Sequence, residues 1–142
     1  MSKDIKSSKN NQVIPGELTK DDEIKLKSVL DTLEKDPMSY EFLNPVDTIG
    51  LGLSDYFDYV KYPMDLGTVN KKLKNNKYVY VQDAIDDIFR IWTNCKIYNM
   101  EGSDIYRMAE SLEKISKKLL EKHYKLNKIP TFNSKYFYIY KI

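Results

Sequence analysis

Four stretches of the chain place apolar residues at intervals of three and four, and this spacing constrains the fold more than any other feature. The pattern predicts helices over about residues 19–36, 65–74, 81–98 and 103–126. Each helix carries one apolar stripe, which must be buried against another element. Two of the connections between the helices are short and one is long. The sequence therefore predicts an all-α protein built as a four-helix bundle.

Capping residues place the ends of these helices. Thr19, Asp65 and Ser103 each precede an apolar stripe, where a side-chain oxygen can accept a hydrogen bond from the first turn. Pro37 is expected to end the first helix, because proline cannot continue one. The chain beyond Pro37 does not continue the helical spacing.

The third helix, over residues 81–98, has an apolar face and a charged face. Its predicted buried stripe consists of Ile85, Ile88, Phe89, Trp92 and Cys95. The residues expected to face water are Asp83, Asp86, Asp87 and Arg90. Charged side chains are rarely buried unless they are paired, so the solvent face is the expected place for them.

Residues 37–64 combine three prolines and two glycines with many large apolar residues. A loop of this length is uncommon in a compact domain, and where the helices around it are correctly assigned it is usually functional. Its apolar content predicts that it packs against the bundle. Within it, residues 54–61 can form a short helix with Ser54 as the cap.

The length of 142 residues fits one domain with one core. We expect a flexible N-terminal tail over residues 1–16, a helical domain over 17–128 and an aromatic extension over 129–142. The extension can pack on the bundle, pair between chains or begin a further element. No apolar run reaches the ~18 residues of a membrane span, and no secretory signal is recognisable, so we expect no membrane partner and a reducing compartment.

Residues that carry catalysis or bind metals are scarce. The single cysteine and single histidine exclude an internal disulfide and the ordinary Cys/His zinc sites. The glycines are too scattered to form a phosphate-binding loop. Cys95 lies on an apolar stripe, where cysteine is usually inert, and His123 is expected at the surface. The sequence therefore predicts a protein that is not an enzyme and that uses no cofactor or metal.

The most informative residues lie in the long loop and around the connection between the last two helices. The stretches FLNPVD, DYFDYVKYPMDLGTV, WTNCKIYN and SDIYRMAESLE occur there in this order. Together they resemble the bromodomain, a family of acetyl-lysine readers, over about residues 19–126. The resemblance rests on several separate motifs, and it is greatest to bromodomains of chromatin-associated scaffold proteins.

This resemblance implies a left-handed bundle of helices Z, A, B and C, with the long Z–A loop and the short B–C loop forming a pocket at one end. It implies that the Asn99 amide donates to the acetyl carbonyl, and that Tyr56 binds the same carbonyl through a water. The other residues implied to form the acetyl-lysine pocket are Phe42 at the floor, Val46, Leu51 and Leu53 on the loop side, Cys95 and Tyr98 on the helix wall, and Ile105 at the mouth. Tyr59 and Asn94 belong to the same set of residues without an assigned role. Taken alone, Asn99 could be only a helix cap and Tyr56 only a core residue.

The chemistry of acetylation agrees with such a pocket. Acetylation converts an ammonium group into a neutral amide, which a dry apolar pocket accepts at modest cost when the carbonyl finds a donor. A charged lysine would lose its hydration with no carboxylate to compensate for it. An asparagine supplies the required donor without adding charge.

Charge is spread unevenly along the chain, although the net charge is only +2. Residues 41–68 hold one lysine against five carboxylates, and residues 99–113 hold one arginine against four. In the implied fold both stretches lie at the pocket end, where they could attract a lysine-rich histone tail. Residues 114–142 hold eight lysines against one glutamate, and they either contact DNA or an acidic partner or form a solvated face.

We therefore expect a module that binds acetylated histone tails, within a larger nuclear protein that regulates chromatin and transcription. One alternative is a helical protein–protein adaptor with a vestigial pocket. Another is the non-catalytic reader module of a chromatin-modifying enzyme.

The chain also departs from the family pattern at several positions in the loop. Tyr40 and Glu41 replace a Trp-Pro pair that many relatives have, and Ser54 stands where proline is common. Gly50 and Gly52 are expected to loosen the loop. These departures leave the asparagine in place and affect ligand selectivity and the rigidity of the pocket.

Overall fold

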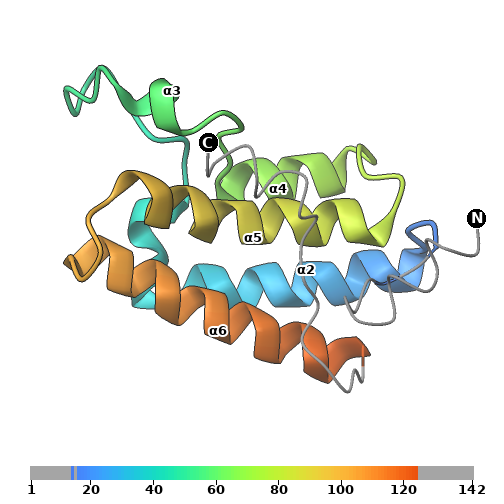
Figure 1. Cartoon of the computed structure of the whole chain (residues 1–142). Helices are drawn as coiled ribbons and strands as arrows, with labels where there is room; N and C mark the ends of the chain where they lie inside the picture. Colours follow the sequence, from blue (N-terminus) through green and yellow to red (C-terminus); the bar gives the residue numbers. More distant parts are fainter. Residues whose placement is uncertain (1–13, 15, 125–142) are drawn as a thin grey trace, which may run out of the picture.

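The computed structural model describes Ile14 and residues 16–124. Most of the predicted N-terminal tail, the fourth predicted helix beyond Tyr124 and the aromatic extension lie outside the described residues. The long helices of the structure are α2 (Lys20–Lys35), α4 (Leu66–Lys74), α5 (Val81–Tyr98) and α6 (Asp104–Tyr124) (Figure 1). The prediction of an all-α four-helix bundle is confirmed.

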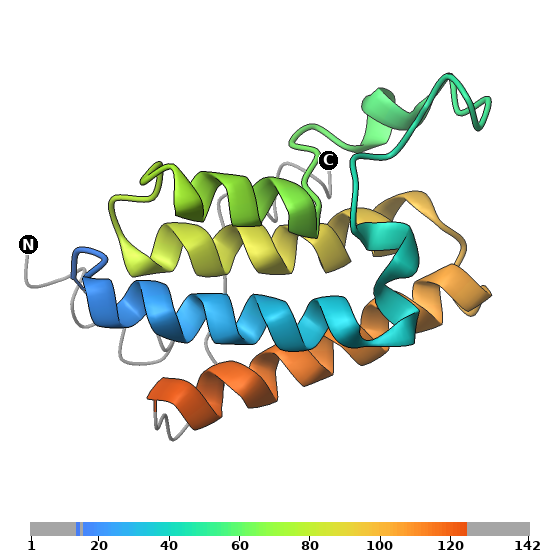
Figure 2. The same cartoon turned by 180° about the vertical axis from the view of Figure 1, so that it is seen from behind.

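The connections between the helices determine where a site can form. Helix α5 packs against both α4 and α6, and α2 packs against the same two helices from the other side. The long connection from α2 to α4 contains a 3-10 helix, η1 (Pro37–Phe42), and a short helix, α3 (Tyr56–Tyr59). Figures 1 and 2 show this connection at the same end of the bundle as the short turn between α5 and α6. Two connections far apart in the sequence are therefore brought together there.

The ends of α2 follow the sequence signals. The Thr19 side chain accepts a hydrogen bond from the backbone N–H of Asp22, and the Asp22 carboxylate accepts one from the backbone N–H of Thr19. This reciprocal capping box satisfies two backbone donors at the start of the helix. The helix ends at Lys35, and Asp36 then caps η1 by accepting a hydrogen bond from Met38 N. Pro37 thus stops the helix as predicted, because its ring cannot continue it.

Helix α4 begins where the loop backbone comes very close to it. Asp65 caps the helix by accepting a hydrogen bond from Thr68 N at 2.9 Å, as predicted. Gly67 N donates to the carbonyl oxygen of Leu43 at 3.0 Å, which joins the start of the loop to its end. A Cβ atom on Gly67 would lie 2.6 Å from that oxygen. Glycine at this position therefore allows the loop to close.

The short helix in the loop differs from its prediction. It covers only Tyr56–Tyr59, and Asp55 rather than Ser54 stands at its N-cap position without a side-chain cap bond. The prediction of Ser54 as the cap is therefore wrong. The amide of Tyr56 donates instead to the carbonyl of Leu53, so local backbone turns replace the cap.

The charged face of α5 is also different from its prediction. The apolar stripe is buried as expected and Asp83 is exposed, but Asp86, Asp87 and Arg90 are buried. The prediction that these three side chains face water is wrong. Helix α4 packs against α5, and Lys72 of α4 and Tyr78 of the turn after it reach Asp87, contacts that the periodicity of α5 alone does not reveal.

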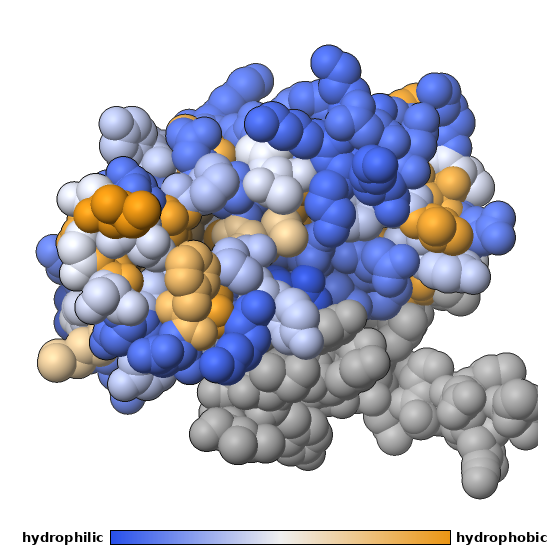
Figure 3. All heavy atoms as spheres, turned by 90° about the horizontal axis from the view of Figure 1, so that it is seen from above, coloured by the Kyte–Doolittle hydropathy of each residue, from blue (hydrophilic) through white to orange (hydrophobic). Residues whose placement is uncertain are grey.

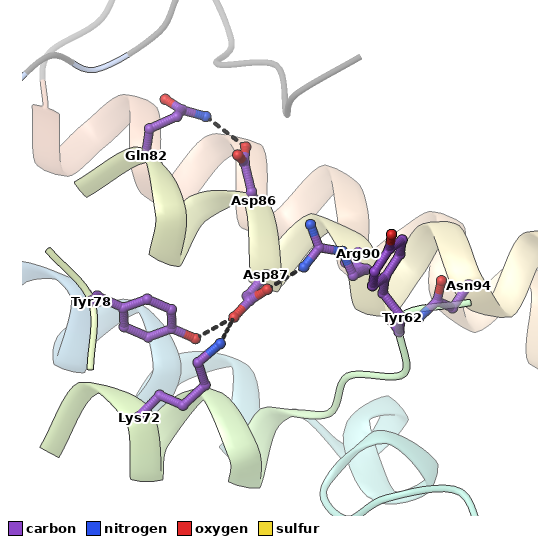
Figure 4. Close-up of polar contacts among 8 residues, drawn as sticks. All are labelled: Tyr62, Lys72, Tyr78, Gln82, Asp86, Asp87, Arg90 and Asn94. Atoms are coloured by element: carbon purple, nitrogen blue, oxygen red, sulfur yellow. Dashed lines mark hydrogen bonds and ion pairs between the residues drawn. The ribbon is translucent and has the colours of Figure 1, made fainter. Parts of the chain in front are cut away.

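The structure pairs the buried charges of α5. Asp87 accepts hydrogen bonds from Lys72 Nζ at 2.7 Å and from the Tyr78 hydroxyl at 2.6 Å, and it is ion-paired with Arg90 (Figure 4). Burial and the adjacent Asp87 carboxylate raise the pKa of Tyr78 well above its ordinary value. An unpaired buried charge is costly. The buried Asp87 carboxylate is therefore stable only while its partners remain in place.

The described residues before α2 lie against the start of α5. Ile14 is buried, and its backbone N–H donates to Gln82 Oε1 at 3.0 Å. Glu17 forms an isolated antiparallel bridge with Tyr80. The predicted boundary between tail and domain, at residues 16 and 17, falls within this contact region.

The close approach at Gly67 predicts an unusual effect of substitution. Alanine normally stabilises a helix relative to glycine by about 0.5–1 kcal/mol. Here Gly67→Ala is expected to lower the free energy of unfolding by about 1–3 kcal/mol, because the added Cβ forces the Leu43 carbonyl away. Urea denaturation measures this difference, with the exposed α4 variant Lys71→Ala as the control. A stabilised Gly67→Ala protein would contradict the proposed contact.

Candidate functional site

A cavity of about 480 Å³ lies at the end of the bundle where the long loop meets the connection between α5 and α6. Its walls come from η1, the loop, the last turns of α5 and the first turn of α6. All nine residues that the sequence analysis assigned to a pocket line this one cavity: Phe42, Val46, Leu51, Leu53, Tyr56, Cys95, Tyr98, Asn99 and Ile105. Residues from three separate parts of the chain are thus gathered around one space.

Aromatic side chains form the closed end of the cavity. Phe42 and Tyr56 are both buried. The Phe42 ring meets Trp92 edge to face with 5.2 Å between centroids, and Tyr56 meets Tyr98 in the same manner at 4.9 Å. Aromatic pairs of this geometry add to the stabilisation that burial provides. These rings are therefore part of the buried core of the bundle.

Aliphatic side chains at the opening are much more exposed. Val46 is 38% exposed and Leu51 is 64% exposed, although both line the cavity. The neighbouring Ile49 is 91% exposed. Figure 3 shows hydrophobic side chains gathered at the loop end of the molecule, with hydrophilic surface beyond them. An exposed apolar patch of this kind is typical of a ligand-binding surface.

Asn99 stands at the C-terminal cap of α5, where the helix ends at the cavity. Its backbone N–H and its side-chain Nδ2 both donate to the carbonyl oxygen of Cys95, each at 3.0 Å. Nδ2 also lies 3.5 Å from Cys95 Sγ, which is a weak acceptor. A side-chain amide has two N–H groups. One is used by the Cys95 carbonyl, and the other has only the weak sulfur acceptor as a partner, which a ligand oxygen can replace.

Cys95 joins the helix wall of the cavity to the first turn of α6. Its thiol donates to the carbonyl oxygen of Ile105 with 3.4 Å between sulfur and oxygen. Burial raises the pKa of the Cys95 thiol to about 11. The side chain is therefore neutral near pH 7, and it contributes a small apolar surface to the wall.

Tyr98 ties α5 to the outer part of the loop. Its hydroxyl donates to Asp55 Oδ1 at 2.7 Å, and this hydrogen bond raises the pKa of Tyr98. Tyr59 packs edge-on against the Tyr98 ring at 6.0 Å but is exposed and does not line the cavity. Tyr59 therefore supports the cavity wall from outside through its contact with Tyr98.

The charges that line the cavity are all negative. Glu41, Asp47 and Asp65 belong to the lining, which contains neither lysine nor arginine. Asp65 is buried and already caps α4, and Asp47 accepts a hydrogen bond from Gly50 N at 2.9 Å. Glu41 is exposed. The opening therefore presents a negative field to an approaching ligand.

Some lining residues were missed by the sequence analysis or had no role in it. Ile91 lies one helical turn before Cys95 on α5, and Met64 precedes the cap of α4. Asn94 also lines the cavity and is buried. The four-residue spacing from Ile91 to Cys95 would have placed both on one wall. No local pattern marks Met64, which reaches the cavity only through the path of the loop.

Two other features are absent from the described part of the chain. No group of three or more histidine, cysteine, aspartate or glutamate side chains among residues 14 and 16–124 is arranged to hold a metal ion. Within the same residues, no helix is both long and apolar enough to cross a membrane.

The sequence was compared with models of known protein families. The bromodomain model matches residues 26–111, from the middle of α2 into the first half of α6. The chain belongs to the bromodomain family. Helices α2, α4, α5 and α6 are accordingly its helices Z, A, B and C, and the cavity lies between the Z–A and B–C loops.

Membership of this family has direct functional consequences. A bromodomain is a reader module that binds acetylated lysine in peptides, and it is generally non-catalytic. Bromodomains typically occur in nuclear chromatin proteins.

The environment of Cys95 predicts its reactivity. A thiol with a pKa of about 11 holds roughly a hundredfold less thiolate at about pH 8 than one with the ordinary thiol pKa of 9.0. Cys95 should therefore react with an aromatic disulfide reagent at least about a hundredfold more slowly in the folded protein than in urea. Absorbance at the wavelength of the released thiolate measures both rates. Similar rates in the two states would contradict the buried position of the thiol.

The same shift predicts a dependence of stability on pH. The pKa of Cys95 is higher in the folded protein than the ordinary thiol pKa of 9.0, so the protonated thiol stabilises the fold fully below pH 9.0. This contribution is lost as the pH rises from 9.0 towards about 11. Urea titrations across this range should show a smaller loss of stability in Cys95→Ala than in the unaltered protein. Equal losses would show that Cys95 does not contribute.

Proposed function

We propose that this bromodomain binds acetylated lysine of histone tails in its cavity, as part of a nuclear protein that regulates chromatin and transcription. The observation that carries the proposal is the position of the Asn99 amide. It is held at the cavity by the Cys95 carbonyl, and its second N–H, which meets only the weak Cys95 sulfur acceptor, can turn to a ligand carbonyl. We assign to Asn99 the hydrogen bond to the acetyl group, and to Tyr56 a bond to the same group through a water.

The remaining lining residues suit the rest of an acetylated lysine. The buried Phe42 and Cys95 present an apolar floor and wall for the acetyl methyl group. Val46, Leu51 and Ile105 lie where the methylene chain of the ligand would enter. Burial of these methylene groups is worth about 0.8 kcal/mol each. One small side chain supplies little area, so we expect affinity in the micromolar range or weaker.

The cavity favours the neutral amide of acetylated lysine over the charged lysine, because a charge would have to lose its water there. Of the three carboxylates that line the cavity only Asp65 is buried, and it accepts hydrogen bonds from Thr68 at the start of α4. An ammonium group in the cavity would therefore lose its water without a free buried partner. An acetylated lysine meets this environment without a charge.

The negative opening supports a basic peptide as the ligand. Glu41 is exposed at the cavity, and Asp55 lies on the outer loop, where it accepts from Tyr98. These charges would attract the unmodified lysines and arginines that surround an acetylated position in a histone tail. Contact of the lysine-rich C-terminal region with DNA or an acidic partner stays a prediction.

Replacement of Asn99 tests the proposal directly. Calorimetric titration should detect binding of acetylated histone-tail peptides and no binding of the unmodified peptides. Asn99→Ala removes the donor and should weaken binding at least about tenfold, the equivalent of one hydrogen bond to a buried group. The matched control is Asn75→Ala, which alters the C-terminal cap of α4 instead of α5.

The alternatives give different results in the same titration. A helical adaptor with a vestigial pocket would bind its partner without regard to acetylation or to Asn99. The reader module of a larger enzyme would behave as the proposal states and would show no activity by itself. Equal binding of acetylated and unmodified peptides would reject the reader function.

The charge at the opening gives a separate prediction. Glu41→Gln should weaken binding of a lysine-rich acetylated peptide by about 0.2–1 kcal/mol at low ionic strength, as expected for an exposed charge. The difference should shrink as salt is added, because salt screens exposed charges. Asp83→Asn, in the first turn of α5 at the far end from Asn99, is the control. The same loss in both variants, or a loss that salt does not change, would contradict the role of the opening.

A further inference from the structure

One face of α5 carries polar residues that bind different parts of the chain in succession. Asp87, Arg90, Asn94 and Tyr98 follow one another at intervals of three and four, which places them on one side of the helix. Asp87 binds α4 and the turn after it, whereas Tyr98 binds Asp55 in the loop. The two residues between them face the segment that joins α3 to α4.

That segment, residues 60–65, forms part of the cavity wall. Met64 and Asp65 line the cavity, and Pro63 has no N–H with which to form a backbone bond. Asn94 Nδ2 donates to the carbonyl oxygen of Tyr62 at 2.9 Å. The guanidinium of Arg90 lies over the Tyr62 ring, 5.7 Å from its centroid. Figure 4 shows Arg90 and Asn94 facing Tyr62 from the helix.

The amide of Asn94 is not explained by packing inside the bundle. Its side chain is 2% exposed, and its Oδ1 is buried without a hydrogen-bond partner among the described residues. A buried polar group with an unused acceptor is unfavourable, and an apolar residue of similar size would avoid that cost. An apolar residue could not donate the hydrogen bond to the Tyr62 carbonyl, and this bond accounts for an asparagine at position 94.

We propose that Asn94 is a positioning residue for recognition of acetylated lysine. It holds the segment over residues 60–65 against α5, and it thereby fixes Met64 and Asp65 in the lining of the cavity. The Arg90 guanidinium supports the same segment from the Tyr62 ring. This inference rests on the proposed function, since it concerns affinity for the ligand of that cavity.

The test compares two substitutions that each remove one buried hydrogen bond of α5. Asn94→Leu keeps a side chain of similar size and removes the bond to the loop. Ser116→Ala removes the bond that Ser116 Oγ accepts from Trp92 Nε1 at 3.0 Å, between α5 and α6 and outside the cavity lining. Both variants should lose stability, as measured by urea denaturation. Calorimetry with an acetylated histone-tail peptide, on folded protein, then compares their affinities.

The proposal predicts that the two variants differ in binding. Asn94→Leu should bind the peptide about tenfold more weakly, whereas Ser116→Ala should change affinity by less than about twofold. Amide hydrogen exchange should accelerate at residues 60–65 in Asn94→Leu while the helices stay protected. Unchanged affinity with unchanged local exchange, or an equal loss of affinity in both variants, would overturn the proposal.

Three further outcomes are distinguished. If Asn94→Leu does not fold, Asn94→Ser replaces it, because the smaller polar side chain avoids a clash. If neither protein folds, Asn94 is a residue of the folding core and the positioning role is rejected. If the unaltered protein binds no acetylated peptide, the proposed function fails instead, and hydrogen exchange at residues 60–65 still shows whether Asn94 holds the loop.

Discussion

A loop can form one wall of a binding cavity only when bonds outside regular secondary structure hold it in place. Residues 43–65 include a single short helix, and ordering them costs conformational entropy that local turns do not offset. Three hydrogen bonds between distant parts of the chain help to tie this segment to the bundle: Gly67 N to the Leu43 carbonyl, Tyr98 to Asp55, and Asn94 to the Tyr62 carbonyl. Two of the three come from α5, so the helix that carries Asn99 also holds the wall opposite it.

The predictions succeeded where the signal was local. Helical spacing and the caps Thr19 and Asp65 depend only on neighbouring residues, and they placed the helices within a residue or two. The solvent face of α5 was mispredicted because the partners of Asp87 are Lys72 and Tyr78, which the fold brings to it. Whether a charged residue of an amphipathic helix is buried can therefore be judged only when its partner is known.

The candidate site was predicted for a different reason. Periodicity alone would have assigned Asn99 to a helix cap and Cys95 to the core, and the structure shows that both are also true. Only the order of several motifs indicated that these residues share a cavity with Val46 and Leu51. Met64 was missed because its place in the wall depends on the path of the loop between Tyr62 and α4. No residue pattern within that segment records this path.

The two hydrogen bonds that converge on the Cys95 carbonyl have an energetic consequence. The Asn99 side chain is already restricted by its own bond and by the backbone bond beside it before any ligand arrives. The Asn99 side chain therefore loses its conformational entropy when the protein folds, and ligand binding causes little further loss. A preorganised donor of this kind lets a ligand as small as an acetyl group use nearly all of its hydrogen-bond energy for affinity.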